Sequence, residues 1–325
     1  MQEKINTDFF DYLKTLTDAS CVIPTTCARS ALVQGLRAFN IGRMDEILIP
    51  PYMCQAVLSA LSRTSFPTML YSSRTKAILV FHQFGFPQDL AFIEKKASEN
   101  GWLMVSDCAH TIFSRYKGQN VLGWGDFSVV SLSKIFPCVL GGALVSPNKS
   151  FAATVQANVN SLSQKDKAWV EKAYKVLEAN QQKVFGDEAV FEIAAIYGFL
   201  PEMASFPSKA ENFLPKTQET LKQDADRRRQ LWMIVRSFFP RLVPDCPECD
   251  VVPWAVPVKG ALVKINRAVC TIKKKTGISL PVLHFDFARN MLKPNYQPAL
   301  IIECSSALTE RKVTKICEGL KALGF

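Results

Sequence analysis

A chain of 325 residues can hold one large core and a smaller lobe, and 48% hydrophobic with 21% charged residues is typical of a folded globular protein, not a disordered one. The longest apolar stretches, such as residues 77–81, fall far short of the ~20 residues that span a bilayer, so we expect no membrane segment. The net charge of +10 is densest at residues 227–229 and 273–275, but both runs lie in helical patterns without a nucleic-acid-binding motif, so we expect solvated helix faces and no nucleic-acid partner.

The N-terminus and the cysteines bear on location. Residues 1–8 lack the basic start and apolar stretch of a secretion signal, so we expect a cytoplasmic protein. Ten cysteines spread mostly singly along the chain are typical of small core residues in a reducing compartment. The one close pair, Cys246 and Cys249, supplies only half of a structural zinc site. We therefore expect a proline-containing loop there and no metal.

From Cys21 to Val145 the chain alternates between strand and helix patterns. The apolar periodicity predicts helices at residues 28–39, 52–61 and 88–100, and strands at 46–49, 77–81, 102–105, 127–132 and 143–145. This alternation predicts an α/β fold with a mostly parallel sheet covered by helices on both faces. Ligands of such sheets bind at the carboxyl ends of strands, where Asp107 and Lys134 fall.

The second half of the chain has a different texture. Residues 150–235 have helical patterns, with breaks near Gly198, Pro201, Pro207 and Pro215. Beyond Pro240 the patterns predict a small α+β lobe, with strands at 251–257 and 299–304 and helices at 259–275 and 309–323. We therefore predict a large domain at residues 1–235, with an N-terminal helix and a helical connector, and a small domain at 236–325.

The first candidate for chemistry is Lys134. It follows the strand predicted at residues 127–132 and precedes the pair Gly141–Gly142, which opens another strand. A lysine at the edge of a sheet can form a Schiff base with an aldehyde when burial or nearby positive charge depresses its pKa. The alternative is an ordinary surface lysine. Ser131 and Ser133 can donate hydrogen bonds to a phosphate, or they can satisfy their own backbone.

A second apolar strand leads to Asp107, with Ala109 and His110 close behind. A carboxylate beside a pyridine nitrogen keeps that nitrogen protonated, although aspartate also often fills turns. Ala109 is small enough to lie against a flat ring, and His110 can reach a ring hydroxyl, although a lone histidine is more often structural. Residues 24–32 predict a turn into a helix whose N-terminus forms an anion site. Together these are the groups that pyridoxal 5′-phosphate (PLP) needs.

This ensemble resembles the DegT/StrS family of PLP-dependent aminotransferases of fold type I, many of which aminate keto sugars on nucleotide carriers. The order and approximate spacing of the matching segments agree with the family over roughly residues 20–146. The matching segments are Cys27–Leu32, Asp45–Pro50, His82–Asp89, Ser106–His110, Tyr116–Gly118, Gly125–Asp126, Ser131–Lys134 and Gly141–Gly142.

The resemblance implies a homodimeric enzyme with PLP as its cofactor. It makes Lys134 the residue that forms the Schiff base and then moves the proton as general base and acid, Asp107 the partner of the pyridine nitrogen, and His110 the neighbour of the ring hydroxyl. It also implies small-molecule substrates: an amino donor such as glutamate and a keto sugar as acceptor.

The resemblance further implies which residues hold the rest of the cofactor. Ala28, Arg29 and Ser131 become phosphate contacts, the first two largely through their backbone. The position that often carries a ring-stacking aromatic falls at or near Cys54, so either Cys54 covers the ring or Tyr52 does.

Several features depart from the family pattern. Ala28–Arg29 replaces a common glycine–threonine pair, the loop after Lys134 is short, and residues 150–235 contain no counterpart of the Asn-rich motif that reaches the neighbouring subunit's phosphate. Two alternatives therefore stay open: another PLP-dependent reaction, such as elimination, decarboxylation or condensation, and a non-catalytic relative that binds a ligand. The sequence leaves open the roles of His82, Tyr116, Trp124 and His284; the last either lines the site from the small lobe or caps its core.

Overall fold

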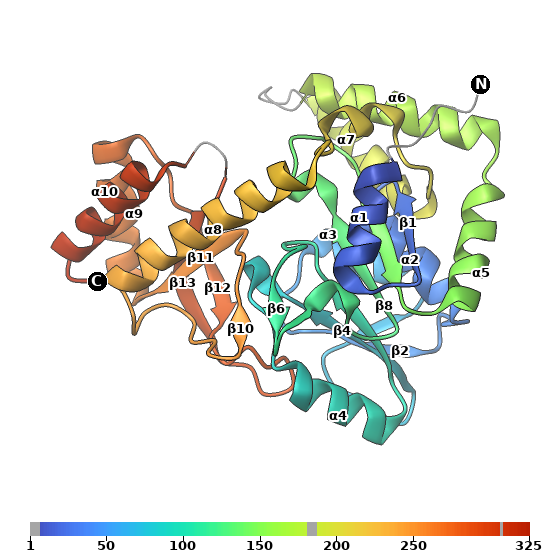
Figure 1. Ribbon diagram of the computed structural model, residues 1–325, viewed down its shortest axis with the longest axis horizontal. Coiled ribbons are helices and arrows are strands. Elements are labelled where there is room, and N and C mark those ends of the chain that lie inside the picture. The colour runs from blue at the N-terminus through green and yellow to red at the C-terminus, as the bar shows by residue number, and fades with distance from the viewer. Residues whose placement is uncertain (1–6, 181–186, 306–307) are drawn as a thin grey trace.

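The computed structural model describes residues 7–180, 187–305 and 308–325 (Figure 1). Residues 1–6, which carry most of the N-terminal stretch behind the predicted location, lie outside the described residues. The helices are α1 (Thr7–Thr17), α2 (Ala28–Ala38), α3 (Gln55–Leu61), α4 (Leu90–Asn100), α5 (Lys149–Asn160), α6 (Gln164–Asn180), α7 (Asp187–Phe199), α8 (Gln218–Phe238), α9 (Leu262–Thr276) and α10 (Glu310–Ala322). The strands are β1 (Cys21–Thr25), β2 (Glu46–Leu48), β3 (Phe66–Thr68), β4 (Thr75–Phe81), β5 (Leu103–Asp107), β6 (Arg115–Tyr116), β7 (Gln119–Asn120), β8 (Phe127–Ser131), β9 (Gly142–Ser146), β10 (Cys249–Asp250), β11 (Ala255–Lys259), β12 (Val282–Asp286) and β13 (Tyr296–Glu303).

A seven-stranded sheet organises the N-terminal half of the molecule. Its strand order is β1-β9-β8-β5-β4-β2-β3. The strands from β8 to β3 pair in parallel, and β9 runs antiparallel to both of its neighbours. The predicted mostly parallel sheet is therefore confirmed. Because β5 and β8 are parallel neighbours, their carboxyl ends meet at one edge of the sheet.

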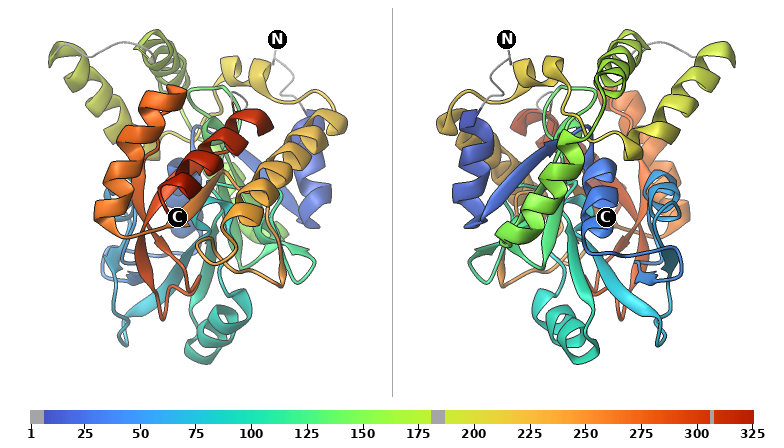
Figure 2. Two further views of the ribbon diagram at one scale, coloured as in Figure 1. Left: turned by 90° about the vertical axis from the view of Figure 1, so that its left-hand side faces the viewer. Right: turned by 90° about the vertical axis from the view of Figure 1, so that its right-hand side faces the viewer.

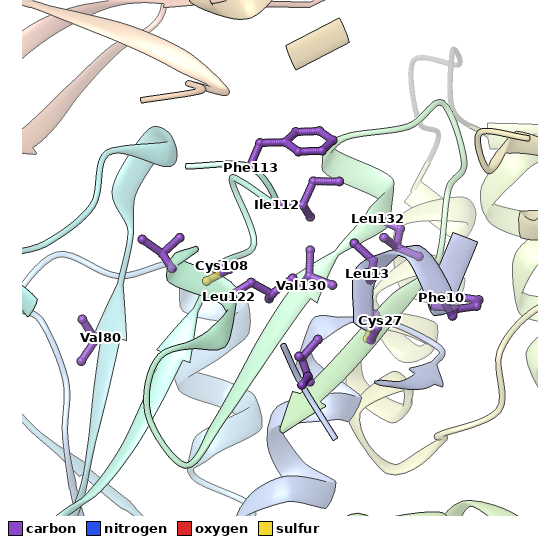
Figure 3. Close-up of a cluster of buried hydrophobic side chains, with 14 of the residues drawn as sticks. Phe10, Leu13, Cys27, Val80, Cys108, Ile112, Phe113, Leu122, Val130 and Leu132 are labelled. Atoms are coloured by element: carbon purple, nitrogen blue, oxygen red, sulfur yellow. The ribbon is translucent and has the colours of Figure 1, made fainter. Parts of the chain in front are cut away.

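Side chains of this sheet alternate between two apolar layers. In β4, Ile78 and Val80 join the cluster formed with α1 and α4, whereas Ala77 and Leu79 join the cluster formed with α2, α3 and α5. Such burial on both faces explains why the strands read as continuous apolar runs. Figure 3 shows part of the first cluster, in which Leu13 of α1 lies close to Leu132, two residues before Lys134.

A second core surrounds the antiparallel sheet β11-β13-β12 near the C-terminus. Helices α8, α9 and α10 form a layer on this sheet (Figure 2). The small α+β lobe is thus confirmed, although β12 was not predicted and the strand predicted to begin at residue 251 begins at Ala255. The domain boundary predicted between residues 235 and 236 falls inside α8, and the division into domains stays a prediction.

A small sheet, β10-β6-β7, connects the two halves, because β10 follows α8 in the chain while β6 and β7 belong to the N-terminal half. Just before β10, in the stretch expected to form a proline-containing loop, Cys246 and Cys249 form a disulfide, which the sequence analysis did not predict. The backbone N–H of Cys249 donates to the carbonyl of Cys246 at 3.1 Å, and this turn brings the two Cα atoms to 5.4 Å, within disulfide range.

The basic run Arg227–Arg229 is less solvated than expected. Arg228 is buried and donates to Asp224 at 2.7 Å, and Arg229 contacts both Asp226 and Asp250. Acidic side chains therefore balance much of this charge locally. Within the described ranges, no helix combines the length and apolar character needed to cross a membrane.

Candidate active site

A cavity of about 270 Å³ lies where the carboxyl ends of β5 and β8 meet the N-terminus of α2. The structure brings seven of the eight predicted site residues to its wall, and these are Ala28, Arg29, Cys54, Asp107, Ala109, Ser131 and Lys134. The eighth, His110, stands behind Lys134 and contacts it directly. Residues separated by more than 100 positions in sequence therefore form one site.

Lys134 ends a short 3₁₀ turn, Leu132–Lys134, that follows β8. The loop after it returns through Gly141, whose N–H donates to the Thr26 carbonyl at 2.8 Å. A Cβ on Gly142 would lie 2.4 Å from the carbonyl carbon of Cys27, so only glycine lets β9 pass this close to the start of α2. The glycine pair thus packs the lysine turn against the anion-binding end of the helix.

Lys134 and His110 are in direct contact, and the hydrogen bonds around them bear on the protonation of both side chains. His110 Nδ1 accepts a hydrogen bond from the Phe84 N–H at 3.0 Å, so the ring proton of neutral His110 sits on Nε2. Lys134 Nζ lies 2.8 Å from Nε2, so the neutral form of the amine accepts this proton's hydrogen bond. Burial is the main cause that lowers the pKa of Lys134, and burial followed by the charge of Lys134 lowers that of His110.

Asp107 is the last residue of β5 and is almost fully buried. One of its oxygens accepts the Ala109 N–H at 3.0 Å, and no other donor among the described residues is bonded to it. Burial raises the pKa of Asp107, while the charge of Lys134 and the Ala109 N–H act in the opposite direction. The carboxylate can therefore accept a hydrogen bond from a protonated group of a ligand in the cavity.

Ala28 and Arg29 begin α2 and line the cavity. The first N–H groups of a helix have no acceptor within it and attract anions. Ser131 and Ser133 stand at the same wall, with their hydroxyl oxygens 3.3 Å apart. The Arg29 guanidinium lies 5.1 Å from the ring centre of Tyr197 in α7.

Of the two residues proposed to cover the ring, Cys54 and Tyr52, the structure places only Cys54 at the cavity wall. Cys54 is the N-cap of α3, which begins three residues later than predicted, and it lines the cavity. Tyr52 does not; its ring lies 5.6 Å from that of His284 and 5.8 Å from that of Tyr296. The carbonyl of His284 accepts a hydrogen bond from Gln83, which links the two lobes next to this aromatic group.

The remaining residues of open role lie outside the cavity wall. His82 is fully buried, and its Nδ1 accepts the Gln88 N–H at 3.2 Å. Burial lowers the pKa of His82 to about 3, so it stays a neutral structural residue. Tyr116 donates to Asp89, and burial together with this carboxylate raises its pKa to about 12.

Two residues that the sequence did not indicate also contact the site. Tyr197 lines the cavity from α7, in a stretch whose sequence carried the least information. Trp254, at the start of the C-terminal sheet, stacks on His110. No local pattern could have found either, because both arrive from segments with their own apolar periodicity.

Comparisons with known proteins point to one family of enzymes. Residues 69–181 match the DegT/DnrJ/EryC1/StrS aminotransferase family. L-glutamine:scyllo-inosose aminotransferase of Streptomyces griseus is 29% identical over 164 residues, which cover 44% of this chain and 38% of that protein. The matched segment thus spans well under half of the length of this curated relative.

Solved structures match over nearly the whole chain. A DegT DnrJ EryC1 StrS aminotransferase from Brucella abortus superposes with a TM-score of 0.71 at 12% identity, covering 99% of this chain and 91% of that one. The PLP-form of the sugar aminotransferase Spr1654 from Streptococcus pneumoniae gives a TM-score of 0.64 at 16% identity, covering 99% and 91%. At these identities the match concerns the fold, and it confirms the predicted fold type I class.

Proposed function

Because residues 69–181 match the DegT/DnrJ/EryC1/StrS aminotransferase family, we propose that this chain is a PLP-dependent aminotransferase that moves an amino group from an amino acid such as glutamate to a keto sugar. The observation that carries the proposal is the Lys134 amine, in contact with His110, in the same cavity as the buried carboxylate of Asp107. A nucleophilic amine and an acid on one small cavity suit an aldehyde-bearing pyridine ring.

The residues of the cavity fit this cofactor. Lys134 would hold it covalently through Nζ, and Asp107 would accept a hydrogen bond from its pyridine nitrogen with the oxygen that Ala109 leaves free. His110 Nε2–H would donate to the ring hydroxyl, since this proton already points toward Lys134. The backbone N–H groups at Ala28 and Arg29, with Ser131, would receive the phosphate, while Cys54 and Ala109 would cover the ring.

When bound, PLP supplies an electron-poor ring that stabilises negative charge at the α-carbon of the amino donor. The protein supplies the proton transfer. Lys134 Nζ can take the proton that leaves this α-carbon and later deliver a proton to the acceptor, and the lowering of its pKa by desolvation favours the neutral amine that the first step requires. Before the cofactor binds, His110 keeps the amine in place, because its Nε2–H donates to Nζ.

The proposal is tested with purified protein, PLP and amino donors. We expect a yellow chromophore that borohydride fixes to a peptide containing Lys134, and we expect glutamate to convert it to the pyridoxamine form in a single turnover. Formation of ammonia or carbon dioxide from the amino acid, without pyridoxamine phosphate, would instead assign one of the other PLP-dependent reactions. A protein that takes up no PLP would contradict the proposal altogether.

We also infer that the enzyme is a homodimer, with the second copy packed next to the cavity. Helix α7 exposes apolar side chains, among them Phe191 at 77% and Phe199 at 55%, and its Tyr197 lines the cavity. Leu70 at 82% and Tyr71 at 64% form a further exposed group after β3. Clusters of apolar side chains that are this exposed to solvent commonly mark protein–protein interfaces.

Light scattering after gel filtration tests the dimer. We expect twice the mass of one chain for the wild type, and Phe191→Asp should weaken association by at least about tenfold, because a charge would be buried in an apolar contact. Val263→Asp is the control, since Val263 is 85% exposed on α9 of the other lobe. A monomeric wild type, or equal dissociation of both variants, would contradict this placement.

A further inference from the structure

We propose that Trp254 is a positioning residue for the reaction: it clamps both His110 and Lys134 from the C-terminal lobe and thereby keeps His110 Nε2 against the lysine amine. Its catalytic consequence rests on the proposed function. The structural part of the proposal concerns only residues of this chain and can be tested without cofactor.

Four residues form a closed ring of hydrogen bonds. The Trp254 backbone N–H donates to the Phe84 carbonyl at 2.8 Å, and the Phe84 N–H donates to His110 Nδ1 at 3.0 Å. His110 Nε2 lies 2.8 Å from Lys134 Nζ. Trp254 Nε1–H closes the ring by donating to the Lys134 carbonyl at 3.0 Å. Trp254 is therefore bonded to both ends of the chain of contacts that orients the lysine.

Ring stacking reinforces this arrangement. The Trp254 indole lies 4.8 Å from the His110 imidazole, with only 12° between the ring planes. Phe84 stacks against both, at 5.7 Å from His110 and 6.1 Å from Trp254. Because two aromatic rings lie nearly parallel to the imidazole, rotation of His110 about its side-chain bonds would require them to move.

The position of Trp254 is itself strongly determined. A Cβ on Gly85 would come within 3.0 Å of the Val252 carbonyl and 3.1 Å of Trp254 N, so glycine is needed for the two segments to meet. The Ser114 hydroxyl oxygen accepts the Val252 N–H at 2.9 Å, and the Cys304 N–H donates to the Trp254 carbonyl at 2.8 Å. The tryptophan is thus attached to both lobes.

Phe84 shows that this geometry is imposed on the chain. Phe84 is buried, and its φ of 55° lies in the left-handed region, which an aromatic residue rarely adopts. This conformation points its N–H toward His110 and its carbonyl toward Trp254 at the same time. The surrounding contacts therefore maintain a strained residue whose two backbone groups both serve the clamp.

Loss of the clamp has a chemical consequence of definite sign. Without the indole, His110 loses a stacked ring and the Lys134 carbonyl loses its hydrogen-bond donor, so the contact between His110 Nε2 and Lys134 Nζ loosens. A neutral amine that no longer accepts the Nε2–H is less stabilised, and this loss favours the charged form of Lys134. We therefore expect an amine that is less reactive at neutral pH, together with slower proton transfer in the reaction.

The test compares Trp254→Phe, which keeps a stacking ring and loses the N–H, with Trp254→Leu, which loses both. In cofactor-free protein, labelling of Lys134 by acetic anhydride is followed against pH by peptide mass spectrometry. For Trp254→Leu we expect the half-maximal labelling pH to rise by about one unit and kcat to fall about a hundredfold. For Trp254→Phe we expect an unchanged labelling profile and a kcat about fivefold lower at unchanged KM.

Trp232→Phe is the matched control, because Trp232 is buried in the same lobe and packs edge-on against Phe86 without contacting the site. It should match the wild type in both measurements. The proposal is overturned if the Trp254 variants also match it. Should Trp254→Leu fail to fold, the kcat of Trp254→Phe decides alone. A wild type that binds no PLP would contradict the proposed function, while the labelling profiles would still test the clamp.

Discussion

Lys134→Ala is expected to abolish covalent capture of PLP and to lower the rate of the glutamate half-reaction by on the order of 10⁴-fold, because one amine serves as both the attachment point and the proton carrier. Borohydride reduction followed by peptide mass spectrometry measures the first effect, and stopped-flow absorbance measures the second. The cavity should still take up PLP through the start of α2 and the Asp107 carboxylate.

Two further variants isolate the role of the Lys134 amine. Lys134→Arg keeps a long cationic side chain but cannot supply a neutral amine, so we expect it to be as inactive as the alanine variant. Lys76→Ala removes an exposed lysine of β4 and should leave both measurements unchanged. Borohydride-stable attachment of PLP to Lys134→Ala would show that another amine holds the cofactor.

Asp107→Asn is expected to lower kcat by about 10³-fold, because a neutral amide no longer keeps the pyridine nitrogen of the cofactor protonated. We expect the substitution to leave the fold intact, since the asparagine oxygen can still accept the hydrogen bond from the Ala109 N–H. Steady-state kinetics with glutamate measure this loss. Asp107→Glu keeps the charge and should retain more activity than Asp107→Asn.

A second measurement on Asp107→Asn needs no cofactor. The negative charge of Asp107 raises the pKa of Lys134 and partly offsets the lowering by burial. Removing that charge should therefore lower the pH of half-maximal Lys134 labelling further, by about one unit. A labelling profile identical to that of the wild type would mean that the two side chains are not coupled across the cavity, and the proposed cofactor geometry would then fail.

Much of the site follows from local patterns. Asp107 and Lys134 each come directly after an apolar run of strand length, and alternation of strands with helices implies that neighbouring strands are parallel. Parallel strands end at the same edge, so residues 27 positions apart meet there without any further information. The start of α2 joins them for a similar reason, because β1 runs in the same direction as β8, with only β9 between them.

Other contacts come only from long-range packing. His110 was expected to reach a ring hydroxyl, but its tautomer depends on the Phe84 N–H, which reaches it only because Phe84 adopts a left-handed backbone. Tyr197 reaches the cavity from α7, and the helical pattern of α7 does not predict which part of the molecule this helix packs against.

By itself, the sequence determined the α/β class, the parallel arrangement of the central strands and the candidates Lys134 and Asp107, because these depend on apolar periods within one strand or helix. The tertiary structure alone decided that Cys54 rather than Tyr52 lines the cavity, that Cys246 bonds to Cys249 and that Trp254 reaches the lysine. These three placements depend on where turns end and on how the two cores pack against each other. The spacing of apolar residues within one strand or helix contains no information on either.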